Sequence, residues 1–331
     1  MNVNISTKTV ISGIFALFFA LYLLGVYWSF EPAQFNIRAE VSKAASEENV
    51  TPVVGYATTT ALIRVTETLL NKPGGYLSND AIPPSVFLDN IPSWELGALE
   101  MVRDMSLVMR QEFSRSQSQS TENKHLKIAQ PQFNIDHTSW AIPSAEGEYQ
   151  KAINELYAYR TALTQINNPS AQFYARSDNL RAWIQEATKR LGSYSQRLSA
   201  SVGREQINVD LAGDSVAQQS TTSAASMQLK TNWWVIDNEF YEARGACWAM
   251  LHFLKAIEVD FNDVLEKKNA KVSVQQIIRE LEASQESIWS PMVLNGDGFG
   301  MLANHSLVMA NYISRANAAL IDLNDLLSQG Q

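Results

Sequence analysis

The sequence predicts an all-α protein, in which an N-terminal transmembrane helix precedes an elongated antiparallel bundle of six to eight helices. The first reason is a single uncharged apolar run at residues 10–30. The second is that apolar residues recur at steps of three and four through most of the remaining chain, as they do on one face of a helix. The third is that no stretch longer than about five residues alternates convincingly between apolar and polar residues as a strand does.

The apolar run, VISGIFALFFALYLLGVYWSF, is 21 residues long. At 1.5 Å per residue, a helix of this length reaches about 30 Å, the thickness of the hydrocarbon core of a bilayer. Tyr27 and Trp28 stand near its end, where aromatic rings favour the membrane interface. The run is longer than the apolar core of a signal peptide, and bulky residues stand where a cleavage site needs small ones. We therefore expect an uncleaved anchor in the lipid bilayer, with a buried core helix as the alternative.

A short tail, residues 1–9, precedes the anchor, and almost all of the chain follows it. Lys and Arg flank the run on both sides, so their count does not fix the orientation. A short tail before a long domain is typical of a signal anchor, which predicts a cytoplasmic N-terminus and a body outside the cytoplasm. Residues 31–55 are polar and contain Pro32 and Pro52. We expect them to form a stem that spaces the body from the bilayer.

The body, residues 56–331, is expected to hold helices at residues 56–72, 93–113, 144–166, 171–200, 232–268, 273–289 and 302–326. Between them, residues 125–143 contain two histidines and two prolines and are expected to be irregular. Residues 204–231 interrupt the helical pattern and include the low-complexity run QQSTTSAAS. They mark a candidate boundary between two sub-bundles, or a long exposed loop.

The most regular pattern is the heptad repeat in residues 232–268, which is typical of helices that pack at a crossing angle of about 20°. Its apolar stripe is Ile236, Phe240, Ala243, Cys247, Met250, Leu254, Ile257, Phe261 and Val264. The last helix repeats the same steps. The helices at 144–166 and 171–200 share a short turn that contains Pro169, which predicts an antiparallel hairpin. Whether the seams close within one chain or between chains is left open.

Composition excludes some classes of function. The net charge of −8 argues against a nucleic-acid partner, because phosphate binding requires a basic surface. Cys247 is the single cysteine, so no intramolecular disulfide can form, and its place on the apolar stripe predicts that it is buried. No His, Cys or Glu spacing typical of a metal site occurs, and we expect neither a metal nor a cofactor.

The start of the heptad helix is one candidate for chemistry. Asp237, Glu239 and Glu242 stand there among aromatic residues. Paired carboxylates can perform general acid–base catalysis, as in glycan cleavage. The alternative is an acidic first turn that interacts with the helix dipole. His305 is a second candidate, either as a buried core histidine or in a catalytic or pH-sensing role.

A glycine-rich loop before the last helix is the most unusual local stretch. Backbone amides of such a loop can bind an anion or contact a partner, and the candidate residues are Gly296, Asp297, Gly298, Gly300 and Asn304. The sequence lacks the GK[ST] of a P-loop, a preceding strand for a dinucleotide site, and the ligands of an EF-hand. The alternative is a tight turn between helices.

Several sequence segments together indicate a family. They are GGYLSNDAIPPSVFLDNIPSWELGAL, FSRSQSQST, YARSDNLRAW, RLSASVG, DNEFYEARGACWAMLHFLKAIEVDF, DVLEKKNAKVSVQQIIRELEASQE and WSPMVLNGDGFGMLANHSLVMANYISRANAALIDL. The chain closely resembles a family of uncharacterised Gram-negative bacterial membrane proteins, the domain of unknown function number twenty-three thirty-three. The resemblance covers nearly the whole chain and implies an inner-membrane location, in which case the orientation expected above places the body in the periplasm. It implies no activity and supplies no functional residues.

Three hypotheses for function follow. The leading one is a non-enzymatic single-pass inner-membrane protein whose periplasmic helical body acts as a scaffold or interaction module, with a protein partner or self-association through helices. The second is an envelope enzyme that cleaves glycan or peptidoglycan with the carboxylates near 237–242. The third is a ligand-sensing domain, although a tail of residues 1–9 is too short to signal by itself.

Overall fold

The computed structural model describes residues 7–117, 119–165, 171–207, 226–288, 290, 292–295 and 303–329. It confirms the all-α class. The helices are α1 (Thr7–Trp28), α2 (Ile37–Glu48), α3 (Tyr56–Asn71), α4 (Asn90–Val108), α5 (Lys124–Phe133), α6 (Ala145–Thr164), α7 (Ser177–Ser199), α8 (Ile236–Asp260), α9 (Asn262–Lys267), α10 (Lys271–Ala283) and α11 (His305–Ser328). Two short strands, β1 (Arg204–Ile207) and β2 (Ser226–Leu229), pair antiparallel within the stretch where the sequence pattern breaks.

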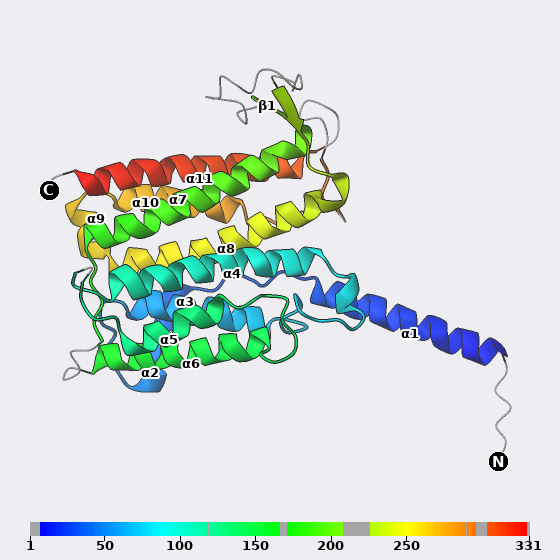
Figure 1. Ribbon diagram of the computed structural model, residues 1–331, viewed down its shortest axis with the longest axis horizontal. Helices are drawn as coiled ribbons and strands as arrows, with labels where there is room; N and C mark the ends of the chain where they lie inside the picture. Colours follow the sequence, from blue (N-terminus) through cyan, green and yellow to red (C-terminus); the bar gives the residue numbers. More distant parts are fainter. Residues whose placement is uncertain are drawn as a thin grey trace, which may run out of the picture.

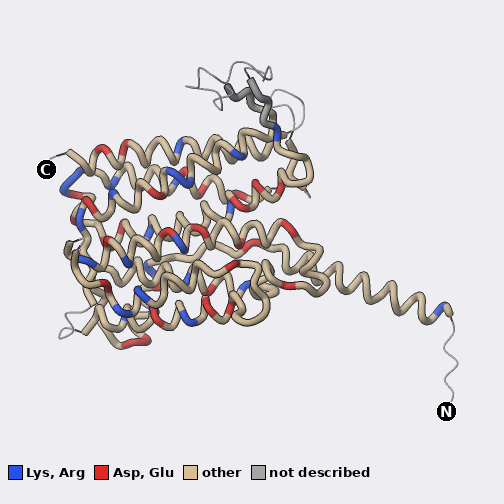
Figure 2. The backbone as a smooth tube through the Cα atoms, viewed as in Figure 1, with Lys and Arg blue, Asp and Glu red and all other residues tan. Residues whose placement is uncertain are grey.

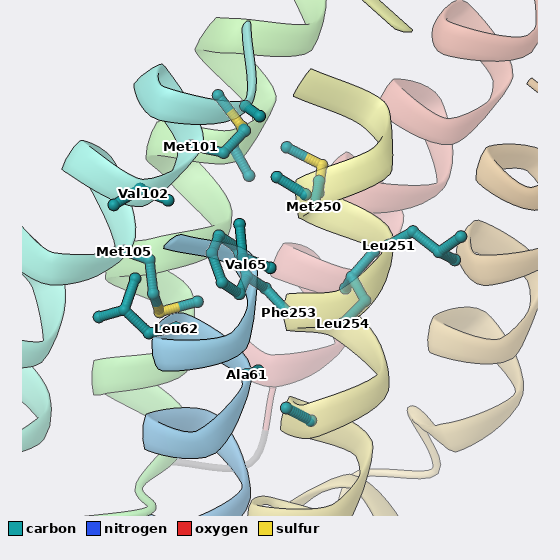
Figure 3. Packing of buried hydrophobic residues seen from close by; sticks show 14 of the residues in the cluster. Ala61, Leu62, Val65, Met101, Val102, Met105, Met250, Leu251, Phe253 and Leu254 are labelled. Atoms are coloured by element: carbon teal, nitrogen blue, oxygen red, sulfur yellow. The ribbon is translucent and has the colours of Figure 1, made fainter. Parts of the chain in front are cut away.

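Helix α1 projects from one end of the body, and the other helices run roughly lengthwise beside one another (Figure 1). The central pair is α4 and α8, which contact each other most extensively. Helices α7, α10 and α11 lie on one side of this pair, and α3, α5 and α6 lie on the other (Figure 1). Buried side chains of α3, α4 and α8 meet between the helices, as Figure 3 shows for Leu62, Met105 and Phe253.

Two glycines allow the central helices to touch. A Cβ atom at Gly97 of α4 would lie 1.8 Å from the carbonyl oxygen of Glu242, and one at Gly245 of α8 would lie 1.9 Å from that of Trp94. Both distances are far shorter than any contact between non-bonded atoms. The two backbones therefore cross at a separation that only glycine permits at these positions.

The stem differs from the prediction. Residues 37–48 form α2, whose Ile37, Val41 and Ala45 are buried against the body. Asn36 caps the helix by accepting a hydrogen bond from the backbone N–H of Ala39. The three apolar residues recur every four positions, so they form one narrow stripe that a mostly polar composition hides. This segment belongs to the body and is not a spacer.

The prediction of an irregular segment at 125–143 is also wrong over its first part. Residues 124–133 form α5, which Asn123 caps, and Leu126, Ala129 and Phe133 are buried against the body. Pro131 lies within three residues of the end of the helix. A proline in that place removes only one of the last hydrogen bonds, so the helix tolerates it.

The predicted hairpin of α6 and α7 is wrong as well. Helix α6 packs on α5 and α3, while α7 packs mainly on α11, on the other side of the central pair. The connecting chain is held where it passes the core. Phe173 packs against Phe113 and Phe261, and the N–H of Tyr174 donates to the carbonyl oxygen of Phe113 at 2.7 Å. These contacts direct α7 away from α6.

The heptad seam is buried as predicted, from Ile236 to Phe261. The helix is interrupted, however: a 3₁₀ turn at Trp233–Val235 precedes α8, and the chain bends at Phe261 before α9. Cys247 is buried, as predicted, and burial raises the pKa of its thiol to about 12. The next helix begins at Lys271, not at Ser273.

Candidate functional site

Helix α1 is the one helix in the described part of the chain that is long and apolar enough to cross a membrane, judged by length and composition. Its most apolar window has a mean hydropathy of 2.3, and 6 % of that window is buried. Figure 2 shows both signs of charge scattered over the body, whereas α1 carries almost none. A membrane anchor and a signal sequence are both compatible with this helix. The region where the end of α1 joins the body, which we call the junction, is the candidate functional site.

Two of the three predicted carboxylates, those of Glu239 and Glu242, bind the same guanidinium in the structure. Arg197 of α7 pairs with Glu239 at 2.8 Å and with Glu242 at 2.6 Å. Asp237 lies apart from this pair, in a groove beside Asp89, and burial together with that neighbouring charge raises its pKa. Burial also raises the pKa of Glu239. This arrangement ties α7 to α8 and leaves neither glutamate as a free acid or base.

Glu242→Gln should therefore have a small effect. The amide oxygen can still accept a hydrogen bond from Arg197, and Glu239 keeps its charge, so the free energy of unfolding should fall by less than about 1 kcal/mol. Urea unfolding measures this change, and complementation of a strain that lacks the protein measures function. Loss of function in a fully folded Glu242→Gln protein would restore the carboxylate-enzyme hypothesis. Glu186→Gln, at an exposed ion pair with Lys189, is the matched control.

His305 begins α11 and takes part in a backbone link. Its Nδ1 accepts the N–H of Leu294 at 3.0 Å, and its own N–H donates to the carbonyl oxygen of Leu294 at 2.8 Å. Burial lowers the pKa of the imidazole. Asn304 caps the helix by accepting from the N–H of Leu307. His305 therefore has a structural role at the base of the glycine-rich loop, whose candidates Gly296, Asp297, Gly298 and Gly300 lie outside the described residues.

The last turns of α1 contact two loops of the body. A Cβ at Gly25 would lie 3.4 Å from Cβ of Pro84 and 3.7 Å from Leu88. Gly74 has a φ of 85°, and a Cβ there would lie 2.8 Å from the ring of Trp28. The indole of Trp28 thus lies directly on a glycine turn, and the end of α1 is in close contact with the body.

A buried ion pair holds that glycine turn in place. Lys72 and Glu95, both almost fully buried, pair at 2.5 Å. The Glu95 carboxylate also accepts the backbone N–H groups of Leu77 and Ser78 at 2.9 Å and 2.8 Å. These bonds compensate for the loss of hydration of the two charges, and they fix the chain on both sides of Gly74.

The chain just after α1 is fixed by Arg244 of α8, which is 6 % exposed. Its Nε lies 2.8 Å and 2.6 Å from the two carboxylate oxygens of Glu31, the first charged residue after the apolar run. Its Nη1 and Nη2 donate to the carbonyl oxygens of Ser284, Glu286 and Gln285, which follow α10. One guanidinium therefore joins the chain just after α1 to two helices of the body, α8 and the end of α10.

His252 fixes the same chain a few residues later. Its side chain is fully buried, and its Nε2 accepts the N–H of Phe35 at 3.1 Å, so its Nδ1 carries the proton and donates to the carbonyl oxygen of Trp248 at 2.7 Å. The Phe35 ring stacks on the imidazole at 3.9 Å between centroids. Burial lowers the pKa of His252 to about 4. Protonation would remove the acceptor for Phe35, so this contact requires the neutral ring.

We expect the stability of the protein to decrease in acid because of His252. Between pH 6.5 and about 4 the unfolded state takes up a proton that the folded state does not, so the free energy of unfolding falls by roughly 3 kcal/mol as the pH falls through this range. Asp260 contributes a slope of opposite sign, because burial raises its pKa to about 6. Urea unfolding of wild type and His252→Gln at pH 7 and pH 5 isolates the histidine. An equal pH slope in both proteins would contradict the prediction.

Sequence reasoning missed most of this junction. Arg244, Lys72, Glu95 and His252 belong to no sequence motif that would single them out. One signal was available: Glu31 is the first charged residue after the long apolar run, so it marks the place where the chain leaves the predicted anchor. Among the described residues, no group of three or more His, Cys, Asp or Glu side chains is placed to hold a metal ion.

The fold and the junction define a class of protein, an all-α body fixed to the end of one exposed apolar helix. The chain belongs to the family described as uncharacterized protein conserved in bacteria (DUF2333), whose model matches residues 3–330. The resemblance noted in the sequence is thereby confirmed. No curated protein and no solved structure matches the chain.

Proposed function

We propose that the protein is a non-enzymatic, single-pass protein of the bacterial inner membrane, whose periplasmic helical body acts as a scaffold or interaction module in the cell envelope. The observation that carries this proposal is the junction. An apolar helix exposed along almost its whole length is fixed to the body by Trp28, by Glu31 with Arg244, and by Phe35 with His252. A body attached in this way keeps one orientation to the bilayer, as a scaffold must.

The membrane part of the proposal is tested with the full-length chain. We expect it to stay in the membrane pellet after a carbonate wash and to keep its N-terminal peptide when examined by mass spectrometry. A C-terminal alkaline phosphatase, which is active only outside the cytoplasm, should be active. A soluble chain that has lost residues 1–30 would mean that α1 is a signal sequence, and an inactive phosphatase would reverse the orientation.

The scaffold part is tested by crosslinking the full-length protein in native membranes, followed by purification and mass spectrometry. We expect a reproducible, stoichiometric protein partner. If no crosslink between chains forms, an interaction module is the wrong description, and the purified protein should then be assayed on envelope glycans.

A further inference from the structure

Large apolar side chains are exposed on the loops at the end of the body from which α1 projects. We call the following set the apolar rim; each member is at least 59 % exposed: Ile82, Phe87, Trp140, Ile142, Trp233, Trp234 and Met292. Single exposed apolar residues are common on protein surfaces, but a gathering of aromatic and aliphatic residues at one end normally marks an interaction site.

Contacts between the loops show that the rim is one region. Trp233, Trp234 and Met292 line a single groove with Asp89, two residues after Phe87. The loop that bears Trp140 and Ile142 is tied to the loop before Ile82, since the side chain of Asn79 donates to Ser139 and Glu146 at 2.9 Å and 2.7 Å. Figure 1 places these loops at the end of the body where α1 leaves.

The contact at Gly25 fixes the height of the rim relative to the apolar helix. Gly25 lies five residues before Phe30, the end of the uncharged run. Three of these residues continue α1 to Trp28, so at 1.5 Å per residue Gly25 lies about 4.5 Å before the end of the helix. Because Pro84 and Leu88 lie beside Gly25, the loop between them, which bears Phe87, overlaps the last turns of that run. This is the depth at which aromatic and aliphatic side chains enter the boundary between headgroups and acyl chains.

The charges beside the rim indicate which force holds it to a membrane. Asp89 and Asp237 line the groove with Trp233 and Trp234, so an anionic lipid surface is not attracted there. The hydrophobic effect and the affinity of indole rings for the interface remain as the driving forces. Binding should therefore need no anionic lipid.

We propose that the apolar rim inserts into the interfacial layer of the same bilayer that α1 spans, so that the body rests on the membrane through these side chains. The proposal depends on α1 being a membrane anchor, as proposed above. The rim then acts as a second, peripheral membrane contact that complements the rigid junction and prevents the body from tilting.

The test places single cysteines in the full-length chain, reconstituted in phosphatidylcholine nanodiscs and labelled with a polarity-sensitive fluorophore. Cys247 needs no removal, because it is fully buried and we expect no labelling of it in the folded protein. The rim positions are Phe87→Cys and Trp234→Cys. The matched control is Val272→Cys, which is 75 % exposed at the start of α10, toward the opposite end of the body, and Leu17→Cys reports on α1.

We expect brominated phosphatidylcholine to quench the probes at 87 and 234 several-fold more than the probe at 272, with the same result when phosphatidylglycerol is added. Equal, weak quenching at 87, 234 and 272 would overturn the inference. Emission that is shifted to the blue without quenching by brominated lipid would also overturn it, because a second copy of the chain would then cover the rim. The probe at 17 separates the two proposals: if it is not quenched, the anchor itself is wrong.

Discussion

Replacing Gly97 with alanine is expected to destabilise the protein by about 3 kcal/mol or more, although alanine is the better helix former by about 1 kcal/mol. The added methyl group would lie 1.8 Å from the carbonyl oxygen of Glu242, 2.7 Å from the carbonyl carbon of the same residue, and 2.9 Å from the backbone nitrogen of Ala246. These are backbone atoms, so no side chain can rotate away, and α4 and α8 have to separate. The methyl group of Gly245→Ala would lie 1.9 Å from the carbonyl oxygen of Trp94, so we expect a similar loss of stability.

Gly192→Ala in α7 is the matched control for this experiment. Its Cβ would meet only the side-chain nitrogen of Asn317 at 3.7 Å, an ordinary contact. This change should raise the free energy of unfolding by about 0.5–1 kcal/mol, because the glycine loses more backbone entropy on folding than alanine does. Urea unfolding of the full-length protein in detergent measures all three variants. If Gly97→Ala were as stable as Gly192→Ala, the close crossing of the central helices would be wrong.

Arg244→Met is expected to lower the free energy of unfolding by about 3–5 kcal/mol, the typical effect of removing one partner from a buried ion pair. The change leaves the Glu31 carboxylate without its cation and removes the donors to three carbonyl oxygens after α10. Arg244→Lys should recover only part of the loss, because one ammonium group cannot bind a carboxylate and three separate carbonyl oxygens in the geometry of a guanidinium.

Arg315→Met controls for the loss of a positive charge. Its guanidinium is half-exposed and pairs with Glu280 at 2.6 Å, so we expect a change of less than about 1 kcal/mol. Limited proteolysis gives a second readout, since Arg244→Met should expose the chain near Glu31 to cleavage before the body unfolds. Equal stability of the two methionine variants, with no new cleavage, would show that Arg244 does not hold the junction.

The sequence predicted those features that follow from local pattern. The apolar run became α1, and the stripe from Ile236 to Phe261 became the buried face of α8, because an amphipathic face has to be buried whatever it packs against. The helices at 37–48 and 124–133 were not predicted, because each has only a few apolar residues among many polar ones. Their apolar residues do recur at helical spacing, but each stripe is too short to stand out in a polar segment.

The sequence by itself determined the class of the protein: one exposed apolar helix, a helical body with long apolar seams, and membership of a family. Only the tertiary structure decided which seam meets which, since every seam is apolar and none encodes its partner. It placed α6 and α7 on opposite sides of the central pair, joined Glu239 and Glu242 to Arg197, and brought Glu31 to Arg244 across more than two hundred residues. The physical reason is that burial sets periodicity along the chain, whereas ion pairs and close backbone crossings depend on distances that arise only when distant segments pack.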